Sequence, residues 1–155
     1  MYPLVIAFFG IFIVGSYGLV IGPKYAQLSM QLTANTNVSN LLQTQRAAAL
    51  YAAYNTAFVL GNIPTAGLTN FYSIGFQGSP NTIAYISGGV VFVYNTSAAS
   101  PLDIATLATQ SGCSNSAGVN SINQTLTTAC SSLVSGITAV PSQVPVGALI
   151  IVGSL

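Results

Sequence analysis

The sequence predicts an α+β protein in which a long apolar N-terminal helix packs on a small, mostly antiparallel β-domain with one short helix. Two observations predict this fold class. Apolar residues fill the first 22 positions and then recur at helical spacing to about Leu60. The remainder contains short β-rich runs bounded by Gly and Pro. We expect an apolar helix at 1–24, an amphipathic helical extension at 25–61, and a β-rich domain outside the cytoplasm at 62–155.

The apolar run from Met1 to Gly22 is long enough to cross a membrane. A helix of 22 residues spans about 33 Å, and the hydrocarbon core of a bilayer is about 30 Å thick. A secretory signal peptide is the alternative, but it has a basic start, a shorter apolar run and a small-residue cleavage site. The first basic residue here is Lys24. We therefore predict a retained membrane anchor, or a helix that packs against copies of itself.

Small residues along this run predict close contact between helices. Glycine has no side chain to hold a neighbouring helix away, which favours helix association in an apolar medium. The alternative is that these glycines are merely part of a membrane span. The predicted assembly helix comprises Phe8, Phe9, Gly10, Phe12, Ile13, Gly15 and Gly18.

The helical pattern continues beyond this run, with two expected irregularities. Pro23 disfavours helical dihedrals at the residue before it, so we expect a kink near 22–24. The weak helix formers at 35–40 predict a kink or a short loop. From Leu41 onward apolar residues recur at helical spacing, and Gly61 is the expected stop. The apolar stripe of this second half must be covered by another element.

The first half of the β-domain contains a crossover and a hairpin. Pro64 to Pro80 is rich in Gly and Asn and predicts an irregular crossover held by its aromatic residues. Ile83–Ser87 and Val90–Tyr94 are β-rich runs separated by Gly88-Gly89. Two such runs joined by two glycines predict a β-hairpin.

The second half contains one helix and a final strand. Ser100-Pro101 predicts a helix start, with Asp103 in the first turn, where a carboxylate suits the helix dipole, and Gly112 predicts its end. The polar stretch 114–130 predicts a loop or an irregular hairpin. Ala148–Val152 predicts an apolar strand.

Two cysteines and three sequons are candidate modification sites. Cys113 and Cys130 have 16 residues between them, and an even cysteine count in an exported domain predicts a disulfide worth about 3 kcal/mol. Two free thiols are the alternative. Asn37, Asn95 and Asn123 begin Asn-x-Ser/Thr sequons and are candidate glycosylation sites, although chance matches are common in a chain this rich in Asn, Ser and Thr.

The charge content excludes most chemical functions. Lys24, Arg46 and Asp103 are the only charged residues, and there is no His. Catalytic dyads and triads, metal sites and nucleic-acid surfaces all need more ionisable residues than these. We therefore expect no catalytic, metal or cofactor site, no nucleic-acid partner and no small-molecule substrate. A nearly uncharged surface favours association, so we expect either a protein from a harsh habitat or a subunit that contacts its own copies.

The layout of the whole chain resembles that of a type IV pilin-like subunit. An N-terminal apolar helix with an amphipathic second half precedes a crossover, a small sheet and a loop bounded by Cys113 and Cys130. The resemblance implies that N-terminal helices bundle in a filament core and that the two cysteines staple the C-terminal loop. Bacterial pilins usually carry glutamate at the fifth mature position, where this chain has Val5. Archaeal pilins are similar in layout and lack that glutamate.

Local stretches are similar to the small PilM-type proteins of conjugative type IVb (thin) pilus systems. The similarity lies in 46–51 (RAAALY), 85–94 (YISGGVVFVY) and 144–150 (VPVGALI). It implies a membrane anchor with a small exported domain that serves the pilus machine. On this resemblance the protein is a basal accessory of the pilus and not the filament itself.

We therefore predict a structural pilin-like subunit of a type IV pilus-type filament, assembled through its N-terminal helix. The alternative is a non-polymerising membrane-anchored accessory of a conjugative pilus machine; a viral coat subunit and a surface adhesin are further alternatives. The expected partners are copies of the chain, the membrane before assembly, and other pilus components. The expected location is the cell surface or the membrane, with adhesion and conjugation among the roles of such filaments.

Overall fold

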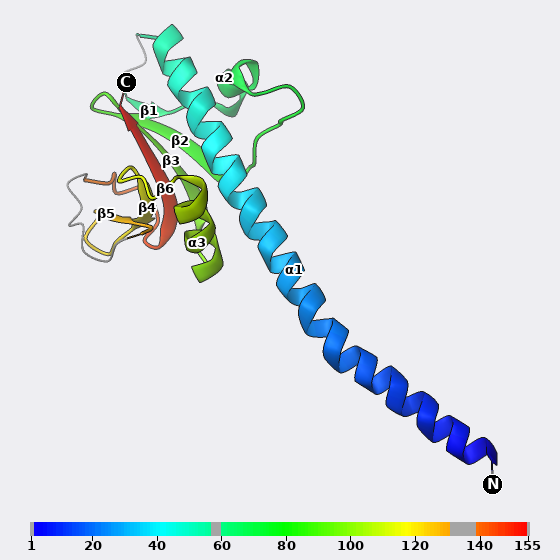
Figure 1. Ribbon diagram of the computed structural model, residues 1–155. Coiled ribbons are helices and arrows are strands. Elements are labelled where there is room, and N and C mark those ends of the chain that lie inside the picture. The colour runs from blue at the N-terminus through cyan, green and yellow to red at the C-terminus, as the bar shows by residue number, and fades with distance from the viewer. Residues whose placement is uncertain (1, 57–59, 131–138, 155) are drawn as a thin grey trace. The chain divides into compact units, whose positions relative to one another are not determined.

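Figure 1 shows a computed structural model of the chain. The structure describes residues 2–56, 60–130 and 139–154, and it describes the side chains from residue 23 onward. The chain divides into two compact units, Met1–Thr33 and Ala34–Leu155. The boundary falls inside the segment 25–61 that the sequence predicts as one extension. The last turns of the long helix therefore belong with the β-domain.

Helix α1 runs from Tyr2 to Tyr54 and contains Pro23. The helix assignment continues through 35–40, so the prediction of a short loop there is wrong, and a kink is shown neither there nor at 22–24. Tertiary contacts outweigh the weak helix propensity of 35–40, because Val38 is completely buried in the core and the Asn37 side chain bonds to the β-domain. The helix ends at Tyr54, before the predicted stop at Gly61.

The described residues of the β-domain form a six-stranded sheet in which every pair of neighbouring strands is antiparallel. The strand order is β1-β2-β3-β6-β4-β5, so the C-terminal strand lies inside the sheet (Figure 1). The strands are β1 (Gly61–Asn62), β2 (Thr82–Ser87), β3 (Val90–Ala98), β4 (Ala117–Asn120), β5 (Leu126–Thr128) and β6 (Ala148–Ser154).

The predicted hairpin and C-terminal strand are confirmed. β2 pairs with β3 through a two-residue turn whose residues, Gly88 and Gly89, have φ angles of 59° and 78°. Positive φ at both central residues is the requirement of a type I′ hairpin turn, which glycine meets without a steric cost. The polar stretch 114–130 forms the hairpin of β4 and β5. The sequence thus predicted the β2–β3 hairpin, and of the two alternatives it left for 114–130, a loop or an irregular hairpin, the structure has the hairpin.

Helix α3 (Pro101–Gln110) is the predicted short helix, and its start has the expected chemistry. Ser100 is the N-cap, its hydroxyl accepts a hydrogen bond from the Asp103 amide, and the Asp103 carboxylate accepts one from the Ser100 amide. This is a capping box with Asp in place of the usual Glu or Gln. The crossover, predicted as irregular, additionally contains the one-turn helix α2 (Thr65–Leu68) and the 3-10 helix η1 (Thr69–Phe71).

Two hydrophobic clusters cover the two faces of the sheet. On the helical face, side chains of α1 and α3 pack on alternate residues of the central strands, and Leu41, Ile86, Val93 and Leu107 are fully buried there. On the loop face, the segment 139–147 covers Phe92, Tyr94 and Ile150. Alternation along β3 and β6 sends successive side chains to opposite clusters. Both faces of the sheet are therefore buried.

Candidate assembly site

Among the described side chains of the N-terminal unit, several exposed apolar ones lie on α1 just before residue 34. Tyr25, Leu28, Met30 and Leu32 are 68%, 51%, 62% and 59% exposed. Tyr25, Leu28 and Leu32 recur at steps of three and four residues and so share one side of the helix, which is typical of a surface that another molecule covers. The predicted assembly residues from Phe8 to Gly18 have a helical backbone, but their side chains lie outside the described part of the chain. Their role stays a prediction.

Where the structure describes side chains, it contains no helix with the length and apolar character needed to cross a membrane. The predicted anchor at Met1 to Gly22 falls on residues whose side chains lie outside that description.

The second half of α1 presents a different kind of surface. Ala47 and Ala48 are fully buried against the sheet, while Arg46, Leu50 and Tyr54 are exposed. Both alanines belong to the same buried cluster as Ile86 and Val93 of the central strands. This half is fixed to the β-domain by one face and leaves the other face accessible.

Aromatic rings join the end of α1 to the crossover. The ring of Phe71 lies 6.0 Å from that of Tyr51 and 5.7 Å from that of Tyr54. Tyr72 and Phe76 form an edge-to-face pair with centroids 4.8 Å apart. These pairs confirm the prediction that aromatic residues hold this crossover. A Cβ atom added at Gly67 would lie 2.7 Å from the ring of Tyr51, so only glycine permits this approach.

Asp103 ties α3 to α1. Its carboxylate accepts hydrogen bonds from the Ser100 hydroxyl at 2.6 Å, the Ser100 amide at 2.9 Å and the Asn37 amide group at 3.1 Å. Burial by itself raises the pKa of Asp103, but these three hydrogen bonds together outweigh it and hold the pKa below its ordinary value. The single acidic side chain of the protein is therefore ionised, buried and occupied by its own fold.

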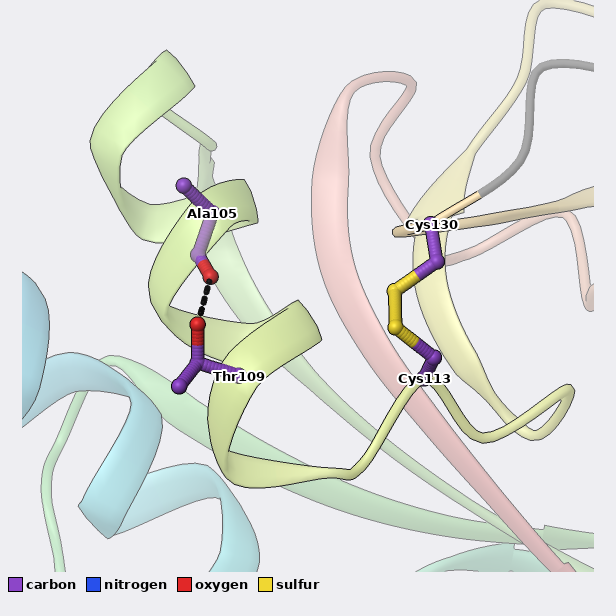
Figure 2. The surroundings of a disulfide bond; sticks show 4 residues. All are labelled: Ala105, Thr109, Cys113 and Cys130. Atoms are coloured by element: carbon purple, nitrogen blue, oxygen red, sulfur yellow. Dashed lines mark hydrogen bonds between the residues drawn. A yellow bond between two sulfur atoms is a disulfide. The ribbon is translucent and has the colours of Figure 1, made fainter.

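The predicted disulfide is present. Cys113 and Cys130 are bonded, with an S–S distance of 2.01 Å and a Cα–Cα distance of 5.4 Å, inside the range for disulfides. Figure 2 shows that the bond links the chain just after α3 to the end of the β4–β5 hairpin. Both cysteines are exposed. The Cys113 amide donates to the Ala108 carbonyl and thereby continues the hydrogen bonding at the end of α3.

The three sequons lie in different environments. Asn37 donates its side-chain amide to Asp103. Asn95 is only 7% exposed, and its side-chain oxygen accepts a hydrogen bond from Thr82. A glycan is attached to the side-chain nitrogen, which at Asn37 already contacts Asp103 and at Asn95 belongs to a nearly buried residue. Asn123 is exposed in the turn between β4 and β5, so it is the sequon whose position leaves room for a glycan.

Asn120 organises the loop face and was not predicted from the sequence. Its side-chain amide, at the end of β4, donates to the Val144 carbonyl at 2.9 Å and to the Gln124 side chain at 3.0 Å, and its main-chain carbonyl accepts from the Gly147 amide. Asn120 is 1% exposed. No sequence pattern marks it out, because its partners Val144 and Gly147 lie far along the chain.

The site residues define a class of protein. In the described residues there is no group of three or more His, Cys, Asp or Glu that could hold a metal ion. The conspicuous features are a long N-terminal helix with exposed apolar side chains, a compact antiparallel β-domain, and a disulfide near the C-terminus. These features define a small α+β protein with the layout of a pilin-like subunit.

Comparison with known proteins gives the family. The family model PilM matches residues 9–152. This chain therefore belongs to the PilM family, a pilus-related family.

A solved structure gives the fold independently. A crystal structure of the protein PilM from Escherichia coli B7A superposes with a TM-score of 0.56 at 19% sequence identity, and the match covers 80% of this chain and 94% of that one. At this identity the likeness shows a shared fold. No curated protein matches the chain.

Proposed function

We propose that this protein is a structural, pilin-like subunit of a type IV pilus-type filament, assembled through its N-terminal helix. The observation that carries the proposal is the division of α1. Its second half contributes side chains to the core of the β-domain, whereas the unit Met1–Thr33 is helical throughout its described residues, from Tyr2 onward. A helix alone forms no core, so its apolar side chains need a partner or a membrane.

Neighbouring subunits would provide that partner. Each apolar side chain such as Phe9 or Ile13 that is removed from water contributes roughly 1.5 to 3 kcal/mol to assembly. A charge at such a position would be left without water or a counter-charge, at a cost of several kcal/mol. The nearly uncharged surface adds little repulsion between copies.

A pair of matched lysine substitutions tests this proposal. Ile13→Lys should abolish filaments, while Thr96→Lys, at an exposed position of β3, should leave their yield nearly unchanged. The measurement is the yield of sheared filaments from cells that contain equal amounts of subunit in the membrane. Normal filaments from Ile13→Lys would show that this helix is not the assembly element.

Family membership favours a second candidate, a membrane-anchored accessory that does not polymerise. The similarity to PilM-type proteins implies a membrane anchor with a small exported domain that serves the pilus machine. In this case sheared filaments would contain little or none of the chain, and the chain would fractionate with the membrane. Both candidates place the β-domain outside the cytoplasm, so protease added to intact spheroplasts should remove it. Protection from protease would contradict both.

A further inference from the structure

A row of three exposed side chains runs along the second half of α1. Arg46, Leu50 and Tyr54 follow one another at four-residue steps, so they lie on one side of the helix. Leu50 is 48% exposed and Tyr54 is 78% exposed, while Arg46 is also exposed. We call this row the Arg46 ridge. It combines one cation with two apolar groups on a helix whose other face is fixed to the sheet.

No acidic side chain of this protein is available to the cation of the ridge. Asp103 is the single Asp or Glu in the sequence. It is 8% exposed and already accepts hydrogen bonds from Ser100 and Asn37. The same holds for every copy of the chain. A second copy that covered the ridge would therefore bury Arg46 without an acidic side chain, and burying an unpaired charge is strongly unfavourable.

Membranes and nucleic acids fit the ridge poorly. Recognition of an anionic lipid surface or of a phosphate backbone relies on several cations, each of which adds only about 1 kcal/mol at a lipid surface. Arg46 is the single Lys or Arg between residues 34 and 155. An arginine fork instead matches one carboxylate with two parallel hydrogen bonds. Leucine and tyrosine beside it offer apolar contact area to the same partner.

We propose that the Arg46 ridge is a docking surface for a different protein, which presents a carboxylate to Arg46 and apolar side chains to Leu50 and Tyr54. This proposal rests on the proposed function in one respect: the partner is sought among the other components of the pilus assembly. The partner's contact is heterotypic whether this chain polymerises or acts as an accessory. In a filament of this chain, the ridge would remain accessible for such a component.

Site-specific photo-crosslinking in cells that assemble the pilus tests the proposal. The crosslinking amino acid replaces Ala53, which is exposed and lies seven residues beyond Arg46 on the same side of the helix. We expect an adduct with another pilus component. Arg46→Glu should lower its yield at least about fivefold, as loss and reversal of an interfacial charge pair predict. Arg46→Lys, which keeps the charge, should lower it less.

Three controls show whether the adduct depends on the ridge and on its charge. The crosslinker at Ile122, which is 82% exposed in the β4–β5 turn, should not give the same adduct. A chain lengthened by three neutral residues after Leu155 moves the main-chain carboxylate away, and the Arg46 effect should persist in it. Equal melting temperatures of the Arg46 variants exclude a folding defect.

Several outcomes would overturn the proposal. One is an adduct between two copies of this chain. Another is a heterotypic adduct whose yield is unchanged by Arg46→Glu. The third is the absence of any protein adduct, including the case in which the chain binds anionic vesicles through Arg46. The test is independent of the filament assay. If Ile13→Lys left filaments intact while the charge-dependent adduct remained, the assembly proposal would fail and the ridge proposal would stand.

Discussion

The two faces of the sheet are buried in different ways. The helical face is covered by α1 and α3, which satisfy their main-chain hydrogen bonds internally and present side chains at helical spacing (Figure 1). The loop face is covered by a segment that does so only in part: the Val144 amide bonds to the Pro141 carbonyl, but the Val144 carbonyl accepts a hydrogen bond from the Asn120 side chain. Buried main-chain polar groups need partners. Both covers contain buried polar side chains, Thr44 and Asp103 on the helices and Asn120 beneath the loop. Asp103 bonds the main chain at the start of α3, whereas Asn120 bonds the main chain inside the loop.

Truncation of the helical face should have the largest effect. Leu41→Ala removes a completely buried side chain of α1 and should lower the free energy of unfolding by about 2 to 5 kcal/mol, because the cavity cannot fully collapse between helix and sheet. Chemical denaturation measures the change. Leu50→Ala on the exposed side of the same helix is the matched control, and an equal loss in both would contradict the assigned burial.

Removal of the disulfide tests the link between the end of α3 and the β4–β5 hairpin. The double variant Cys113→Ser, Cys130→Ser should lose about 3 kcal/mol of stability on the chain-entropy model. Thermal unfolding of the wild-type chain with and without a reductant should reproduce the difference. If the reductant lowered the melting temperature of the double variant as well, the effect would not come from this bond.

The third prediction concerns Asn120, whose side chain bonds the segment that covers the loop face. Asn120→Ala removes the donor to the Val144 carbonyl and should cost about 1 to 3 kcal/mol, since that buried carbonyl loses a partner. Hydrogen exchange should rise at the Gly147 amide, which bonds to the Asn120 carbonyl. Asn123→Ala, at the exposed turn nearby, should change neither measurement. Unchanged exchange in Asn120→Ala would mean that the loop is held by its apolar contacts.

The smallest expected effect is the loss of folding stability at acidic pH that depends on Asp103. The folded pKa of Asp103 lies below its ordinary value of about 4, so the ionised carboxylate stabilises the domain above that pH, and the contribution is lost as the pH falls through the folded pKa. Unfolding measured between about pH 5 and pH 2 should show this loss. Asp103→Asn should remove most of the pH dependence, because the sequence has no other acidic side chain. A slope that survives in the variant would point to the C-terminal carboxylate.

Tyr94 is an ionisable side chain buried on the loop face. Burial raises the pKa of Tyr94, and the nearby Tyr85 raises it further. Both effects disfavour the phenolate form inside the core.

Some features of the fold could be predicted from the sequence and others could not, and the two faces of the sheet differ in this respect. Local chemistry predicted the β2–β3 hairpin, the Ser100 cap and the Cys113–Cys130 bond, because each depends on residues close together or on a cysteine pair. The continuous helix through 35–40 was not predicted, since contacts of Val38 and Asn37 with distant residues decide it. The cover of the loop face was not predicted either, because a loop has no periodicity.

The candidate site was predictable in part. The cysteine pair and the apolar helix were evident, but the Arg46 ridge was not. Arg46 becomes informative only once the structure shows that Asp103 is already occupied.

Gly118 in β4 has a consequence for how this domain can diverge. A Cβ atom there would overlap the main-chain carbonyl of Thr127 on the neighbouring strand, and a backbone atom cannot swing aside as a side chain can. The turn glycines 88 and 89 meet no atom within 4 Å, although their positive φ favours glycine or asparagine. In a saturation library selected for folded protein, position 118 should stay glycine while position 88 also accepts asparagine. Evolutionary drift should therefore be slow in the interior of the sheet and faster at its hairpin tip.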